Sequence, residues 1–282
     1  MHPVWKRKSI SVFFALGFGL PWIGWTLNLL TDTQGALRTA LFYTGDFMSI
    51  GGIVATWAAG GGTAVRALFR RCVAPAGLGW WLAAFLLPLV WSLATRVAYG
   101  LSHGGIGGPD LGAVSMFLSL PAWRAWTTGP LGEEFGWRGF FLPRLLTAYR
   151  PLVASLILGV LWGIWHYPLY AESVFSTLPR GVSFVISTVC FSILMTIFWF
   201  RTRGNILVAI LFHWSVNVSG NVAARMLPLA GGEATRSTPE LWNLAAVILA
   251  TLVAGTMFGW SNLGRRENFQ VERDLEPEAV RN

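Results

Sequence analysis

The sequence predicts an all-α protein, a polytopic transmembrane helical bundle of about eight spans. Its 282 residues are 54% hydrophobic and only 12% charged, and they include 16 tryptophans. The mean hydropathy of +0.54 is typical of multi-pass membrane proteins. Apolar runs of about 20 residues, each long enough to cross a bilayer as a helix, follow one another along the chain.

The predicted spans follow these runs in order. The first begins after a basic triplet at residues 6–8, and it is too long for a signal peptide and lacks a small-residue cleavage site, so we expect it to stay uncleaved. The fourth carries Pro121 and the pair Gly129-Pro130, which predicts a short helix followed by a second one. The runs cover residues 9–30, 40–59, 79–100, 113–147, 151–170, 181–200, 204–223 and 240–262.

The basic residues predict the orientation of the bundle. With the N-terminus in the cytoplasm, 14 of the 21 Lys and Arg residues fall on the cytoplasmic side, 4 on the other side, and 3 inside spans. This bias predicts eight crossings with both termini cytoplasmic. It also explains the net charge of +8 without nucleic acid, because the basic residues are scattered between apolar runs.

The domain organisation that we expect is simple. Residues 1–262 form a single membrane-embedded domain, and residues 263–282 form a charged, disordered cytoplasmic tail, since they mix both charge signs without apolar periodicity. Cys72 and Cys190 are far apart, so they predict neither a disulfide framework nor a cysteine-based zinc site.

Two adjacent glutamates, Glu133 and Glu134, lie inside the fourth apolar run and indicate a functional site. An ionisable side chain at membrane depth costs a few kcal/mol or more, so it is seldom present without a role. Arg138 follows Glu134 by four residues, which places both side chains on one helix face.

Two further polar pairs with the same spacing lie in later spans. Trp162 precedes His166 by four residues, and His213 precedes Asn217 by four. Counted at about 1.5 Å per residue, Glu134, His166 and His213 lie roughly 14–22 Å from the cytoplasmic ends of their spans. We therefore expect the three pairs to converge on a water-filled pocket within the membrane.

These residue types fit the hydrolysis of an amide. A carboxylate can take a proton from water, and histidine can share that role. Histidine and asparagine can donate hydrogen bonds to an oxyanion. Two histidines and a carboxylate, here His166, His213 and Glu133, also match a zinc catalytic set, so a metal-bound water and a Glu/His-activated water both stay open.

In these three motifs the chain resembles the CPBP family of intramembrane proteases, which contains CAAX proteases (type II CAAX prenyl endopeptidases) and bacteriocin-processing enzymes. The family pattern is EExxxR, then FxxxH, then HxxxN on successive helices, and a tryptophan replaces the phenylalanine here. The resemblance covers about residues 110–223, which we call the catalytic half. The matching positions are Glu133, Glu134 and Arg138, then Trp162 and His166, then His213 and Asn217.

The resemblance implies an endopeptidase that cleaves lipidated CAAX-type peptides, other membrane-associated peptides or bacteriocin-like peptides. It also implies a multi-pass protein of a bacterial cell membrane. By it, Glu133 is the base on the attacking water and His166 assists. His213 and Asn217 line the oxyanion hole, or His213 joins a metal site. Glu134 and Arg138 orient the polar cluster. Both a zinc-type divalent metal and a metal-free glutamate mechanism are compatible with the family.

Two other classes compete with a protease. A proton- or ion-coupled transporter also buries Glu, His and Arg, but the polar residues here gather in one half, without the matching halves typical of transporters. A non-catalytic scaffold would be expected to lose a motif residue. The chain lacks the HExxH and GxSxG motifs of other hydrolases. We also expect Asp46 and Arg96 to form a structural ion pair between the second and third spans.

Overall fold

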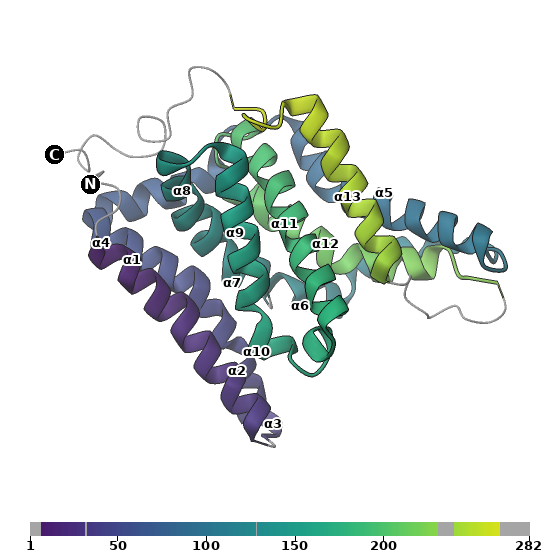
Figure 1. Ribbon diagram of the computed structural model, residues 1–282, viewed down its shortest axis with the longest axis horizontal. Coiled ribbons are helices and arrows are strands. Elements are labelled where there is room, and N and C mark those ends of the chain that lie inside the picture. The colour runs from purple at the N-terminus through teal and green to yellow at the C-terminus, as the bar shows by residue number, and fades with distance from the viewer. Residues whose placement is uncertain (1–6, 32, 128, 231–239, 266–282) are drawn as a thin grey trace.

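Helices make up most of the described chain, because a span in lipid must satisfy its backbone hydrogen bonds internally. The computed structural model describes residues 7–31, 33–127, 129–230 and 240–265 (Figure 1). Within these ranges there is no β-strand, and one isolated antiparallel bridge joins Ile106 to Leu229. The predicted all-α class is therefore confirmed, whereas most of the proposed tail, residues 266–282, lies outside the described residues.

Five helical segments are long and apolar enough to cross a membrane. They correspond to the first, third, sixth, seventh and eighth predicted spans, so the chain is a multi-pass membrane protein. The first segment combines α1 (Arg7–Phe14), the π-helical turn η2 (Ala15–Gly19) and α2 (Leu20–Leu30). The others are α5 (Leu78–Ser102), α11 (Leu178–Arg201), α12 (Ile206–Met226) and α13 (Glu240–Phe258).

The other three predicted runs are interrupted helices, so the total of eight crossings stays a prediction. The second comprises α3 (Gly35–Phe42), η3 (Tyr43–Asp46) and α4 (Phe47–Arg70), and η4 (Arg71–Val73) follows it. The fourth comprises η5 (Leu111–Leu118), α6 (Leu120–Thr127), α7 (Pro130–Glu134), the π-helix η6 (Phe135–Phe141) and α8 (Leu142–Ala148). The fifth comprises α9 (Pro151–Trp165) and α10 (Tyr167–Tyr170), with η7 (Val174–Ser176) beyond it.

Two of these interruptions have clear local causes. Helix α4 kinks at Gly60 and Gly61. Gly61 has a φ of +63°, which residues other than glycine rarely adopt. The break between α6 and α7 falls at Gly129-Pro130, as predicted, because proline favours the first turn of a new helix.

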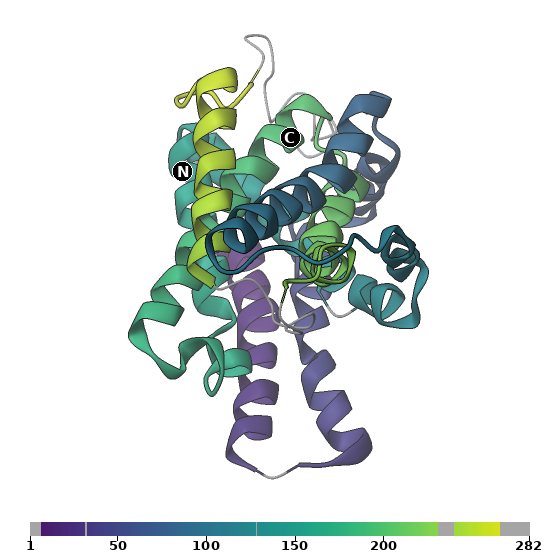
Figure 2. The same ribbon diagram turned by 90° about the vertical axis from the view of Figure 1, so that its right-hand side faces the viewer.

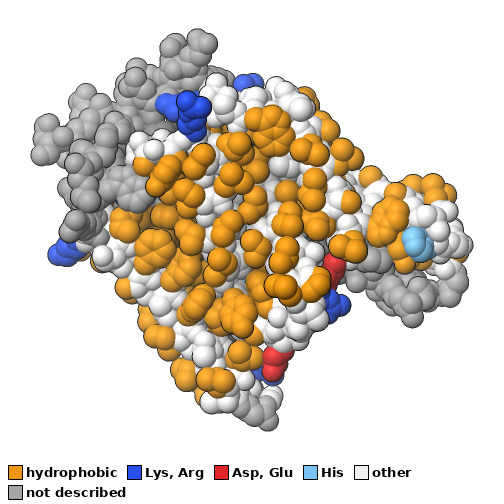
Figure 3. Space-filling model, in the orientation of Figure 1, with side chains coloured by type: hydrophobic (Ala, Val, Ile, Leu, Met, Phe, Trp, Pro, Cys, Tyr) orange, Lys and Arg blue, Asp and Glu red, His pale blue; other side chains and the backbone are white. Residues whose placement is uncertain are grey.

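The bundle is arranged around α9, α11 and α12 (Figure 1). Helix α11 packs along α9, and α12 packs along α5. The first helices and α4 lie on one side, and α5 and α13 lie on the other (Figures 1 and 2). Hydrophobic side chains cover most of the face seen in Figure 3. An apolar surface of this extent suits contact with lipid.

The helix that carries the glutamates is fixed by α4. Ser49 of α4 donates a hydrogen bond to the carbonyl of Leu131 (2.8 Å) and accepts one from the Phe135 amide (3.2 Å). A Cβ on Gly136 would lie 2.3 Å from the Met48 carbonyl oxygen, so only glycine permits this approach.

A buried arginine donates hydrogen bonds to two carbonyl groups of the π-helix η6. The Arg71 guanidinium donates to the carbonyls of Arg138 and Gly139, each at 2.8 Å, and to that of Gly204 at 3.1 Å. Trp199 donates to the Arg138 carbonyl at 3.3 Å. Side chains from other helices therefore stabilise the π-helix. Such π-helical turns are frequent at functional sites.

Candidate active site

Two of the polar pairs predicted from the sequence, Trp162 with His166 and His213 with Asn217, line one cavity of about 110 Å³. The third pair, Glu134 with Arg138, lies behind it. Glu133 comes from α7, His166 from the end of α9, and His213 and Asn217 from α12, and all four line the cavity. Glu133 and the two histidines are at least nine-tenths buried, whereas Asn217 is exposed, so we place it at the open side. Side chains from α7, α9 and α12 thus meet around one cavity.

Glu133 has a different neighbour for each carboxylate oxygen. Its Oε2 accepts a hydrogen bond of 2.6 Å from the indole Nε1–H of Trp162. Its Oε1 lies 3.9 Å from His166 Nε2. This distance is too long for a direct hydrogen bond, but one water molecule can bridge it. The carboxylate is therefore held by one oxygen and presents the other to the cavity.

The hydrogen bonds of His166 define which ring nitrogen carries the proton. Its Nδ1 lies 2.9 Å from the carbonyl oxygen of Trp162. A carbonyl can only accept, so Nδ1 is the donor, and in the neutral ring Nε2 keeps its lone pair. Trp25 and Tyr170 stack on the ring at 6.5 and 5.5 Å between centroids. Nε2 is thereby fixed as an acceptor that faces Glu133.

Glu134 and Arg138 lie behind Glu133 and His166, and both are fully buried. Oε1 of Glu134 accepts from Arg138 Nη1 at 3.0 Å and from His213 Nδ1 at 2.8 Å. The Arg138 guanidinium also lies 4.4 Å from the centroid of the Trp162 ring, a cation–π contact. The buried charges are thus paired, which is the arrangement that buried ions require. The contact with Glu134 orients His213 so that its Nε2 faces the cavity.

Gly129 marks the point where the polar groups converge. A Cβ at this position would lie 3.4 Å from Glu133 Oε1, 3.4 Å from Asn217 Nδ2 and 3.7 Å from His213 Nε2. One small volume is therefore within reach of a carboxylate, of the Asn217 amide, which can donate a hydrogen bond, and of His213 Nε2, which donates only when the ring is protonated. From the sequence, the Gly129-Pro130 pair indicated only a helix boundary.

Two other features of the cavity were not predicted. Trp162 was expected to be only an aromatic wall, but its N–H binds Glu133. Asp46 lines the same cavity and lies against Gly132.

The predicted ion pair between Asp46 and Arg96 is wrong. Asp46 lies at the cavity, whereas the Arg96 guanidinium donates to the carbonyl of Leu227, beyond the end of α12.

The zinc-type ligand set is not assembled in this arrangement. Among the described residues, no three His, Cys, Asp or Glu side chains are grouped so that they could hold a metal ion, and this includes Glu133, His166 and His213. The Nδ1 atoms of His166 and His213 donate to Trp162 and to Glu134, which leaves the Nε2 atoms available towards the cavity. We derive no step through a metal, and the metal requirement stays a prediction for experiment.

The fold and the site define a class of protein: a multi-pass helical membrane protein with a buried Glu–His–Arg cluster around a polar cavity. Residues 115–219 match the family model described as Type II CAAX prenyl endopeptidase Rce1-like. This range contains every residue of the three motifs. The resemblance to type II CAAX endopeptidases that the motifs indicate is thus confirmed for the catalytic half.

A named relative supports the same conclusion. The chain is 31% identical over 99 residues to a protein of Methanococcus maripaludis called CAAX prenyl protease 2. The similar region is 33% of this chain and 36% of that protein, so the chain matches about a third of its relative's length.

Proposed function

We propose that the chain is an intramembrane endopeptidase that hydrolyses a peptide bond in membrane-associated, prenylated substrates. The observation that carries this proposal is the geometry of Glu133, whose free Oε1 faces His166 Nε2 across 3.9 Å inside a polar cavity. The prenylated substrate class follows from the similarity to type II CAAX prenyl endopeptidases over residues 115–219.

The reaction begins with a water molecule between Glu133 and His166. Oε1 of Glu133 takes one proton from the water, and Nε2 of His166 accepts a hydrogen bond from the other. The oxygen then attacks the peptide carbonyl carbon, and the carbonyl becomes an oxyanion. Trp162 keeps the carboxylate in the orientation that this transfer requires, because it holds Oε2 at 2.6 Å.

The oxyanion forms next to the polar groups that surround Gly129. Asn217 Nδ2 donates to it, and His213 donates when its Nε2 carries a proton. When the C–N bond breaks, Glu133 returns its proton to the leaving amine, so the products are a carboxylic acid and an amine, which ionise to a carboxylate and an ammonium group. Gly129 makes room for the substrate carbonyl, since a side chain there would occupy this volume.

Glu134 and Arg138 act as positioning residues in this account. They lie behind the cavity, and their contact with the reacting centre passes through His213 and Trp162. The transporter and scaffold alternatives are not favoured, because the buried polar groups gather at one cavity in the part of the chain that matches an endopeptidase family.

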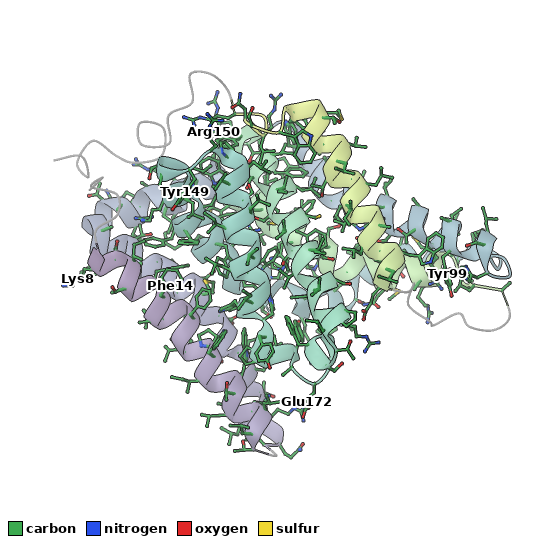
Figure 4. All side chains as sticks on the ribbon, viewed as in Figure 1. Lys8, Phe14, Tyr99, Tyr149, Arg150 and Glu172 are labelled. Atoms are coloured by element: carbon green, nitrogen blue, oxygen red, sulfur yellow. The ribbon has the colours of Figure 1, made fainter. Side chains whose placement is uncertain are left out.

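The test uses purified protein in liposomes and a farnesylated peptide that ends in a CAAX sequence, with products identified by mass spectrometry. Wild-type protein and the control Glu172→Ala are expected to cleave it, whereas Glu133→Ala and His213→Ala are not. Glu172 is exposed and lies at the edge of the molecule after α10 (Figure 4). Equal cleavage by all four proteins would contradict the assigned site.

The same assay separates the substrate classes. An unprenylated peptide of the same sequence and a bacteriocin-like leader peptide are run in parallel. Preference for the farnesylated peptide supports the proposal. Cleavage of the leader peptide alone would assign the second substrate class, and solute flux without any cleavage would favour a transporter.

A further inference from the structure

An apolar groove runs along the outside of the bundle, away from the polar cavity. It lies between α5, α11 and α13 and encloses about 680 Å³. Helix α13 lies beside α5 on the face seen in Figure 2. Alanines such as Ala246 and Ala250 leave space along α13, and aromatic residues such as Trp80 and Trp91 form walls on α5. Its volume is in the range of about 300–1,000 Å³ that small-molecule sites occupy.

The groove extends along most of the membrane depth. On α5 it reaches from Trp80 to Ala98, and on α13 from Trp242 to Phe258. At about 1.5 Å per residue these stretches are roughly 27 and 24 Å long. The hydrocarbon core of a bilayer is about 30 Å thick, so the groove can hold an extended alkyl chain parallel to the lipid tails.

One end of the groove carries a positive charge. The Arg201 guanidinium lies 5.6 Å from the ring centroids of both Trp80 and Phe258, which line the groove. In the described part of the chain no acidic side chain pairs with Arg201, and its buried Nε has no hydrogen-bond partner there. The positive-inside prediction places Arg201 at the cytoplasmic interface, where basic pockets between helices bind anionic lipid headgroups.

The groove and the catalytic cavity are separate sites with a shared wall. Trp91 lines the groove, Phe191 lines the cavity, and their rings stack at 5.9 Å with an interplanar angle of 20°. A chain in the groove therefore lies next to the wall of the cavity but does not enter it. The lipid-binding proposal therefore does not rest on the proposed peptidase reaction.

We propose that this groove binds an anionic phospholipid, with one acyl chain between α5 and α13 and the phosphate on Arg201. The apolar length of the groove suits the chain, and the Arg201 guanidinium, which has no acidic partner among the described residues, suits the phosphate. A zwitterionic lipid offers the same acyl chain, but the cationic group in its headgroup offsets the attraction between its phosphate and Arg201. The site therefore selects for net negative charge.

The experiment measures lipid binding by native mass spectrometry of the purified full chain, titrated with phosphatidylglycerol or phosphatidylcholine of the same acyl chains. We expect tighter binding of phosphatidylglycerol to the wild type. Arg201→Gln is expected to weaken that binding about fivefold, which is the contribution of one basic residue at a membrane surface. Arg150→Gln, at an exposed arginine away from the groove, is the matched control and is expected to bind like the wild type.

A second variant tests the chain-binding part. Ala250→Phe fills the groove and is expected to reduce binding of both lipids, with Ala246→Leu as the substitute if it unfolds. Equal affinity of the wild type for the two lipids, or unchanged binding by Arg201→Gln, would overturn the headgroup assignment. Unchanged binding by the folded groove-filling variant would overturn the groove itself. None of these results depends on peptidase activity.

Discussion

Replacing Trp162 by phenylalanine isolates one hydrogen bond of the site. Phenylalanine keeps an aromatic ring near Arg138 and His213, and its backbone carbonyl can still accept from His166. The change removes the indole N–H that holds Oε2 of Glu133 at 2.6 Å. Phenylalanine is also the residue in the family pattern that this chain resembles, so the substitution is expected to fold.

The expected magnitude follows from the charge on the acceptor. A hydrogen bond to a charged group contributes about 1.5–3 kcal/mol, and about 1.4 kcal/mol corresponds to a tenfold change in rate. If the bond mainly orients Glu133, kcat falls about 10- to 150-fold. KM changes little, because Oε2 is turned towards Trp162 and away from the substrate.

The assay is steady-state cleavage of the farnesylated peptide, with kcat and KM determined separately. Trp57→Phe, at an exposed tryptophan of α4, is the matched control and is expected to behave like the wild type. Trp162→Ala is expected to lose more activity than Trp162→Phe, because it also removes the ring. Unchanged kcat in Trp162→Phe would refute the argument, as would an equal loss in both Trp162 variants.

Three other changes have defined outcomes. Glu134→Gln leaves the buried charge of Arg138 without its partner, so we expect a loss of about 3–5 kcal/mol in unfolding free energy and a lower kcat, and unchanged thermal unfolding would contradict this pairing. Gly129→Ala adds a methyl group 3.4 Å from Glu133 Oε1 and Asn217 Nδ2 and is expected to reduce cleavage with little change in the melting temperature, whereas full retention of cleavage would show that the substrate lies elsewhere. If Glu133 and His166 alone activate the water, chelation by EDTA is expected to leave activity intact. Loss of activity that zinc restores would establish a metal enzyme instead.

The positions of the long spans were predictable because lipid imposes a simple composition on them. A helix such as α11 must be about 20 residues long and apolar, and the sequence shows both properties. The three polar pairs were predictable for a related reason, since charged side chains at membrane depth are few and their spacing of four defines one helix face.

The features that were not predicted depend on contacts between distant parts of the chain. The π-helix η6 requires donors from Arg71, which lies 67 residues before Arg138. Likewise, the N–H of Trp162 meets Glu133 across 29 residues. Local sequence does not encode either contact. The predicted Asp46–Arg96 ion pair was wrong because Asp46 lies at the cavity, whereas the Arg96 guanidinium donates to the carbonyl of Leu227.

The central claim is that the Glu133 carboxylate takes a proton from the attacking water. The most direct measurement is the single-turnover cleavage rate of Glu133→Gln, which keeps the shape of the side chain and an oxygen for Trp162 but provides no base. We expect the rate to fall about 100- to 10,000-fold, with thermal stability and peptide binding like those of the wild type. Cleavage by folded Glu133→Gln at the wild-type rate would contradict the claim.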